Sequence, residues 1–233
     1  MKALIKQAML ATAQGMGILA GLLLSTSAAL AETQSYKQLS GEWWQWVLSI
    51  PAADNPLADL TGEKCMLGQR GADWFLAGTF GAASATRACS IPEDRTLFFP
   101  VVNFVAFDTP NACGQGPTPV PSSVYRGQAA DFINGVANVS ARVDGQPIKA
   151  LHRVQSQVFA LALPKDNLFA AACASSGGLP AGIYSPAVDD GIYVRIDQLA
   201  VGQHTLQIHA ENPSQGFVLD VTYHLKVVPV VEN

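Results

Sequence analysis

Residues 217–228, FVLDVTYHLKVV, alternate between apolar and polar side chains. Every odd-numbered residue from Phe217 to Val227 is apolar, and every even-numbered residue from Asp220 to Lys226 is polar or charged. Neighbouring residues of a strand face opposite sides, so this segment predicts one buried and one solvent-facing side, as in an antiparallel sheet that packs on a second sheet. The fold class we expect is therefore mainly β, a single-domain antiparallel β-sandwich.

Seven further segments are rich in β-branched and aromatic residues or end in turn residues, which indicates strands. They are residues 74–79, 84–89, 96–107, 139–143, 155–163, 192–197 and 204–211. Pro100 lies inside the third segment and predicts an edge strand or a bulge, because proline cannot donate a hydrogen bond to a neighbouring strand. The dipeptide Asp144-Gly145 predicts a tight hairpin.

Two short helices are expected beside the strands. In residues 36–50 apolar residues recur at intervals of three and four, as in an amphipathic helix, and Pro51 ends the pattern. A second helix is predicted near residues 125–136, where Tyr, Ala, Phe and Val recur at the same intervals. Loops 51–71, 108–123 and 174–190 complete a single domain predicted over residues 32–233.

Residues 1–31 have the composition of a signal peptide. Lys2 and Lys6 precede a short apolar run at 16–24, and Ala29-Leu30-Ala31 offers small residues to a signal peptidase. The mature chain is expected to be secreted or periplasmic, and no apolar run of membrane-spanning length follows the leader.

The four cysteines all lie after this leader. An even number of cysteines in an oxidising compartment predicts two structural disulfides, for which three pairings are possible. We favour Cys65 with Cys89 and Cys113 with Cys173, because each bond would tie a long loop to a neighbouring strand. A redox-active pair is disfavoured because no C-x-x-C spacing occurs.

The mature chain is acidic. Of the 14 Lys and Arg residues, Lys2 and Lys6 leave with the leader, whereas all 18 Asp and Glu residues remain, so the net charge becomes about −6. Nucleic acid is excluded as a partner on this ground, because its binding requires a basic surface that displaces counterions.

Trp43-Trp44-Gln45-Trp46 places three indoles within four residues of the first helix. Trp43 and Trp46 belong to its apolar face, and Trp44 lies at the margin of that face. An exposed indole beside hydrogen-bonding groups can stack on a sugar ring, so Trp44, Gln45 and Glu42 are candidate ligand-binding residues. The alternative, which we favour, is that the indoles anchor the helix to the sheet.

His209 and Asp220 become cross-strand neighbours if residues 212–216 join the last two strands, and His224 then lies a pair or two further along. A histidine beside a carboxylate can act as a general base, so these three are candidate catalytic residues. The favoured alternative is that they are solvated surface side chains, as are His152 and His204.

Asp54, Asp59 and Glu63 form one acidic group in a predicted loop, and Asp189 with Asp190 forms another. Neither group has the alternating spacing of a calcium loop, so turn formation and solvated charge are the preferred interpretation. No metal or cofactor is predicted. The motifs of nucleophilic, phosphate-binding and zinc-dependent enzymes are also missing from the sequence, which leaves enzymatic activity unsupported.

Several blocks together resemble a family of uncharacterised exported microbial proteins. The blocks are the WWQW helix at 43–46, NPL at 55–57, the WFLAGTF strand at 74–80, FFPV at 98–101 with Asn103, and DVTYHL at 220–225. The resemblance spans most of the mature chain. It implies a single exported domain and no particular activity.

Two main hypotheses about function follow from these residues, beside a third, which is a structural or assembly subunit that shields an edge strand near Pro100. The first is a non-catalytic binding module of the cell envelope or extracellular space, which presents its loops to a carbohydrate or to another envelope protein. The second is an exported hydrolase that uses carboxylates or the pair His209 and Asp220.

Overall fold

The computed structural model of the chain describes residues 36–81 and 83–230. The predicted leader and its cleavage site lie outside these residues. Lys37–Asn233 cluster as one compact unit, and this unit is described by itself.

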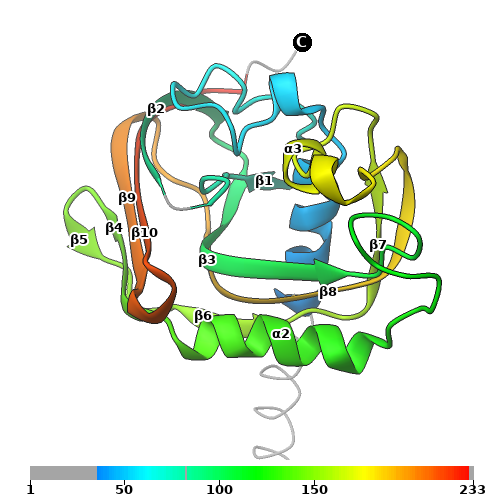
Figure 1. Cartoon of the computed structure of the whole chain (residues 1–233). Coiled ribbons are helices and arrows are strands. Elements are labelled where there is room, and N and C mark those ends of the chain that lie inside the picture. The colour runs from blue at the N-terminus through cyan, green and yellow to red at the C-terminus, as the bar shows by residue number, and fades with distance from the viewer. Residues whose placement is uncertain (1–35, 82, 231–233) are drawn as a thin grey trace, which may run out of the picture. The chain divides into compact units, whose positions relative to one another are not determined.

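The strands of the unit form two five-stranded sheets. Sheet A contains β1 (Asp73–Phe75), β3 (Thr96–Phe107), β8 (Gly182–Ile196) and β6 (His152–Gln155) in that order, and β7 (Phe159–Leu163) also pairs with β8. Sheet B has the order β2 (Ala83–Pro92), β10 (Phe217–Val228), β9 (Gly202–Asn212), β4 (Ala137–Val143) and β5 (Gln146–Pro147). Figure 1 shows β9 and β10 side by side in one sheet and β3 beside β8 in the other.

The predicted mainly β sandwich is confirmed, because apolar side chains from both sheets fill the space between them. Among the buried residues of this core are Leu97, Phe99, Val194, Leu206, Leu225 and Tyr223. The sheets are mixed, however, since β1 pairs with β3 and β2 pairs with β10 in parallel. The alternation in residues 217–228 revealed which face is buried, but it carries no information about the direction of the neighbouring strand.

The helices cover both faces of sheet A. The first helix spans residues 36–48, two residues shorter than predicted, and α2 (Ser122–Asn134) confirms the second predicted helix. A short helix, α3 (Ala170–Cys173), was not predicted. Asp189 of β8 accepts a hydrogen bond from Trp44 of the first helix. Its neighbour Asp190 binds Arg153, and Arg153 also donates a hydrogen bond to Asn134 of α2. Adjacent strand residues face opposite sides, so the two helices lie on opposite faces of β8, and Figure 1 shows α2 running alongside that strand.

The strand predictions differ in accuracy along the chain. Residues 96–107 and 217–228 are strands with the predicted bounds, and a register shift between Pro100 and Val102 confirms the bulge. The strand predicted at 155–163 is interrupted and forms β6 and β7. The largest error concerns β8, which begins at Gly182, so the second half of the predicted loop 174–190 is strand.

Both predicted disulfides are present, Cys65–Cys89 and Cys113–Cys173. The first lies where loop 51–71 approaches β2: Ala88 N donates a hydrogen bond to Thr61 O, and a Cβ at Gly62 would lie 2.3 Å from Ala88 O. Only glycine permits so close an approach. In the described part of the chain, no helix has the length and apolar character needed to cross a bilayer.

Candidate functional site

An apolar pocket of about 300 Å³ opens beside β3, where the two sheets separate. Its wall carries residues from β3, β10, α2, the first helix and three loops. Six of them are aromatic: Trp44, Phe80, Phe104, Phe132, Phe169 and Phe217. Few polar side chains reach it, notably Thr79 and Asn103.

The pocket exists because the chain leaves sheet A soon after β1. Leu76 N still donates to Phe98 O of β3, but both backbone groups of Ala77 bond to the hydroxyl of Tyr223 in β10. The chain therefore crosses from one sheet to the other at Ala77. The segment 78–81 then forms the wall opposite β3, and a wedge of space is left between them.

Aromatic pairs hold the walls in place. Phe132 of α2 contacts both Phe104 and Phe217, at centroid distances of 5.0 and 5.5 Å, so it connects the helix with both sheets. Phe80 meets Phe169 edge to face at 5.5 Å. Phe80 is 43% exposed, so this pair lies where the pocket meets solvent.

A buried polar network lies behind the pocket and contributes two side chains to its wall. Trp44 Nε1 and the Tyr193 hydroxyl both donate to Asp189 Oδ1, over 2.7 and 2.9 Å. Asn103 Nδ2 donates to the Tyr193 oxygen over 3.0 Å. The two ends of the network are Trp44 and Asn103, and both line the pocket. A ligand there would contact two side chains that hydrogen bonds connect through Asp189 and Tyr193.

Gly191 makes this network possible. Asp189, Gly191 and Tyr193 share one face of β8, and the tyrosine ring lies over the glycine, so that its hydroxyl reaches back to the carboxyl group. A Cβ at Gly191 would lie 2.6 Å from both Asn103 Cβ and Tyr193 Cε2. Any larger residue would push the ring off the strand and break the network.

Burial raises the pKa of Asp189 well above its usual value, and the negative charge of Asp190 adds to this effect, against the hydrogen bonds from Trp44 and Tyr193. Asp189 Oδ2 has no hydrogen-bond partner among the described residues. Asp190 differs because the guanidinium group of Arg153 binds it through two nitrogens, at 3.1 and 2.9 Å. The two adjacent carboxyl groups thus differ in that Asp189 is buried with neutral hydrogen-bond donors, whereas Asp190 is ion-paired.

The structure separates the candidate ligand-binding residues of the first helix. Trp44 is only 6% exposed, so it does not offer the exposed platform that stacking on a sugar would need, and it serves as an anchor and as pocket wall. Glu42 and Gln45 are not among the residues that line this pocket. They line a more polar groove of about 620 Å³ together with Trp46.

The candidate catalytic residues lie on the outer face of sheet B. His209 and Asp220 are cross-strand partners as predicted, and Nδ1 lies 2.7 Å from the carboxylate. His209 Nε2 lies 3.3 Å from Glu211, so both ring nitrogens face carboxylates. His224 is opposite Thr205, four residues along the strand from Asp220, and does not join the pair. The Asp220 side chain is 54% exposed, and the hollow beside it measures only about 200 Å³.

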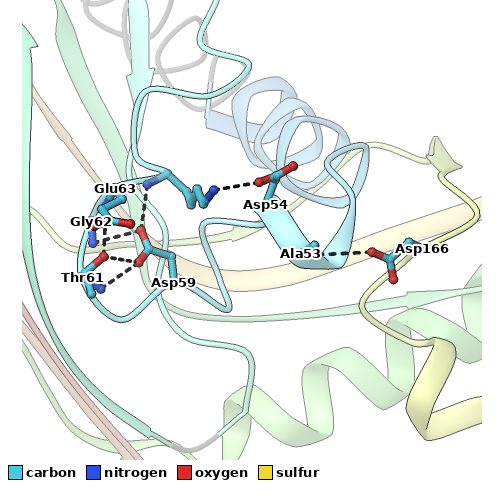
Figure 2. Close-up of polar contacts among 8 residues, drawn as sticks. Ala53, Asp54, Asp59, Thr61, Gly62, Glu63 and Asp166 are labelled. Atoms are coloured by element: carbon cyan, nitrogen blue, oxygen red, sulfur yellow. Dashed lines mark hydrogen bonds and ion pairs between the residues drawn. The ribbon is translucent and has the colours of Figure 1, made fainter.

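The acidic groups considered for calcium are engaged in other contacts. Asp59 accepts hydrogen bonds from the backbone of Thr61, Gly62 and Lys64 and from the Thr61 hydroxyl, and Lys64 pairs with Asp54 at 2.8 Å (Figure 2). These oxygens hold the turn together. Asp189 and Asp190 lie in β8, which corrects their expected position in a loop. Within residues 36–81 and 83–230, no cluster of three or more His, Cys, Asp or Glu side chains could hold a metal ion.

Comparison of the chain with protein-family models, with curated proteins and with solved structures finds no match. The site must therefore be interpreted from its own geometry.

The sequence did not reveal most of the pocket, and it gave no sign that Trp44, Asn103 and Asp189, which were considered for separate reasons, belong to one network. Phe104, Phe132, Phe169 and Phe217 are isolated in the sequence, and only the fold brings them together. The network did leave a local pattern in Asp189-Asp190-Gly191-Ile192-Tyr193, in which a glycine separates two polar residues that share a strand face. Interpreting this segment as a loop concealed that pattern.

Proposed function

We propose that the protein is an exported, non-catalytic binding protein that holds an apolar ligand in the pocket beside β3. The observation that carries the proposal is the aromatic lining of this cavity. Binding pockets are concave and mostly apolar, with a few polar groups that orient the ligand. Asn103 supplies such a group, because its side-chain amide lines the pocket.

Export is supported by the two disulfides and by the form of residues 1–31. Disulfides persist in oxidising compartments such as the periplasm or the extracellular space. Intact-mass measurement of the purified protein should give a chain that begins at Glu32 and carries two disulfides. A retained leader with four free thiols would contradict the proposal.

Ligand binding can be tested with an apolar fluorophore, N-phenyl-1-naphthylamine, whose emission rises in an apolar environment. A Cβ at Gly78 would contact Leu219 at an ordinary 3.4 Å, and Gly78 lines the pocket, so Gly78→Leu should fill it without distorting the backbone. We expect this variant to bind the probe at least tenfold more weakly. The matched control, Gly127→Leu, changes an exposed glycine of α2 with open space around it and should bind normally. Equal binding by both variants would place the probe elsewhere.

A carbohydrate is a second candidate ligand, at the groove that Glu42, Gln45 and Trp46 line. This groove combines polar side chains with an aromatic edge, which is how proteins recognise sugars. A glycan array probed with the mature protein tests this candidate, with Gln45→Ala expected to lose any signal and Gln128→Ala, on α2, expected to keep it. An array without signal would remove the carbohydrate hypothesis.

The hydrolase hypothesis has weaker support. A general base needs an accessible nitrogen beside a substrate pocket, whereas His209 lies between two carboxylates on an open face. His209→Ala is therefore expected to leave binding of the apolar probe unchanged. A hydrolytic activity lost in that variant and kept in His224→Ala would revive this alternative.

A further inference from the structure

The backbone of β3 supplies hydrogen-bonding groups to the pocket. In an antiparallel pair, alternate residues bond to the partner strand and the residues between them direct their N–H and C=O groups the other way. Asp108 N donates to Pro186 O, and the register that follows pairs Phe104 with Asp190 and Val102 with Ile192. The even-numbered residues therefore bond to β8.

Asn103 and Val105 consequently direct their backbone groups away from β8. Asp189 of β8 is the register partner of Val105. The N–H and C=O groups of Asp189 both bond to Ser156 and not to Val105, which agrees with this direction. On the other side of β3, the pairing with β1 ends at Phe98. No strand of the described chain pairs with this edge between Pro100 and Phe107.

The pocket lies against this free edge. Six consecutive residues, Pro100–Val105, line it. Consecutive strand residues have side chains on opposite faces, so they can border one cavity only if the cavity faces the strand edge. The floor of the pocket therefore carries the N–H and C=O groups of Asn103 and Val105, about 7 Å apart along the strand.

We propose that the ligand of this pocket is an extended peptide segment of another protein, which adds to sheet A as a short strand beside residues 102–107. This inference rests on the proposed function and specifies its ligand. Backbone groups that repeat every second residue match an extended chain, and the aromatic walls match apolar side chains at alternate positions. A lipid chain could pack against the aromatic walls, but it would leave the N–H and C=O groups of Asn103 and Val105 without hydrogen-bond partners.

Pro100 and the bulge beside it limit the length of the added strand. Proline has no N–H, and the register shift at Val102 bends the edge, so pairing cannot continue toward β1. The cavity of about 300 Å³ has room for two or three apolar side chains. We therefore expect a bound segment of four to six residues.

The first test is peptide selection. A phage-displayed library of linear octapeptides is selected on the mature protein, with Gly78→Leu used to remove binders of other surfaces. We expect enriched peptides to carry apolar residues at alternate positions and to displace N-phenyl-1-naphthylamine. If the fluorophore binds in the pocket but no peptide is enriched, this inference fails and the proposed function stands. If neither binds, both fail.

The second test separates strand addition from side-chain binding. The best peptide is synthesised in two forms, with N-methyl groups on all odd or on all even residues. A strand pairs through alternate residues, so one form should lose at least tenfold in affinity and the other should lose little. Equal affinities, or equal losses, would overturn the inference.

The third test removes a hydrogen-bond donor from the protein, as N-methylation does in the peptide. Val105→Pro removes an N–H that faces the pocket and leaves the hydrogen bonds to β8 intact, whereas Val105→Thr keeps the N–H. We expect the proline variant to bind the selected peptide at least tenfold more weakly than Val105→Thr does. In the unliganded protein, the amide hydrogens of Asn103 and Val105 should exchange faster than that of Phe104, and peptide should protect them. Slow exchange of all three amides without peptide would contradict the open edge.

Discussion

Trp44 and Asp189 are joined by a hydrogen bond of 2.7 Å between the indole nitrogen and Oδ1. The bond connects the first helix to the middle of sheet A across a buried environment, and among the described residues no cation pairs with this carboxyl group. An ionised carboxylate is costly to bury without a counter-charge. The fold therefore favours the neutral form of Asp189, and this has consequences for stability.

Replacing Asp189 by Asn should change how stability depends on pH. The pKa of Asp189 is raised in the folded state, so the protonated carboxyl group makes its full contribution to the free energy of unfolding below about pH 4, near the unfolded-state pKa. The contribution is then lost as pH rises toward the folded-state pKa, by up to about 1.4 kcal/mol per pH unit. We expect the free energy of unfolding of Asp189→Asn to rise relative to that of the native protein between about pH 4 and pH 7.

Chemical denaturation at a series of pH values measures this difference. Asp131→Asn, at an exposed position of α2, is the control and should show a constant offset. A constant offset for Asp189→Asn as well would mean that the buried carboxyl group is ionised in the folded protein.

Two glycine substitutions should have opposite effects. Gly191→Ala forces a Cβ to within 2.6 Å of Asn103 and Tyr193 in the strand pair, so we expect a loss of at least about 3 kcal/mol in unfolding free energy. Gly127→Ala, in the exposed part of α2 with no atom within 4 Å of the added carbon, should gain about 0.5–1 kcal/mol. Urea denaturation of both variants measures these changes. A small loss of unfolding free energy in Gly191→Ala would show that the ring of Tyr193 can move aside.

The two disulfides should contribute unequally. They close loops with sequence separations of 60 residues for Cys113–Cys173 and 24 for Cys65–Cys89. In the chain-entropy model these stabilise the fold by about 4 and about 3 kcal/mol. Double replacement by serine should therefore cost more at the first pair, as measured by denaturation. The reverse order would indicate that the contact of loop 51–71 with β2 matters more than chain entropy.

His204 should stabilise the protein mainly at acidic pH. A hydrogen bond from its ring to Asp144, followed by the contact with Ala200 O, raises the pKa of His204. Its contribution is then fully present below the unfolded-state pKa of about 6.5 and is lost as pH rises through the folded-state pKa. We expect His204→Gln to destabilise the protein more at pH 5.5 than at pH 9. An equal effect at both values would show that the charge is not involved.

Much of the sandwich could be predicted because its strands carry strong local patterns. The strand limits at 96–107 and 217–228 follow from β-branched and aromatic residues next to turn residues. The hairpin at Asp144-Gly145 also formed, with φ values of 51° and 76° that suit a two-residue turn. In these segments local preference and tertiary packing agree.

The first part of β8 could not be predicted, because the sequence of that part favours a loop although it lies in a sheet. Residues 182–190 contain Gly, Ser, Pro and two Asp residues, which favour a loop. Distant partners decide otherwise: Trp44 and Arg153 each satisfy one of the carboxyl groups, and neither partner can be inferred from residues near β8. The pocket was hidden for the same reason, since its six aromatic rings come from different parts of the chain.

The bond between the first helix and β8 links residues 145 positions apart. A partly synthesised chain that ends before β8 lacks both Asp189 and the edge pairing that positions Asn103. Trp44 would then lack its hydrogen-bond partner until β8 is made. Competence to bind a ligand should therefore appear only after the last third of the chain has been made.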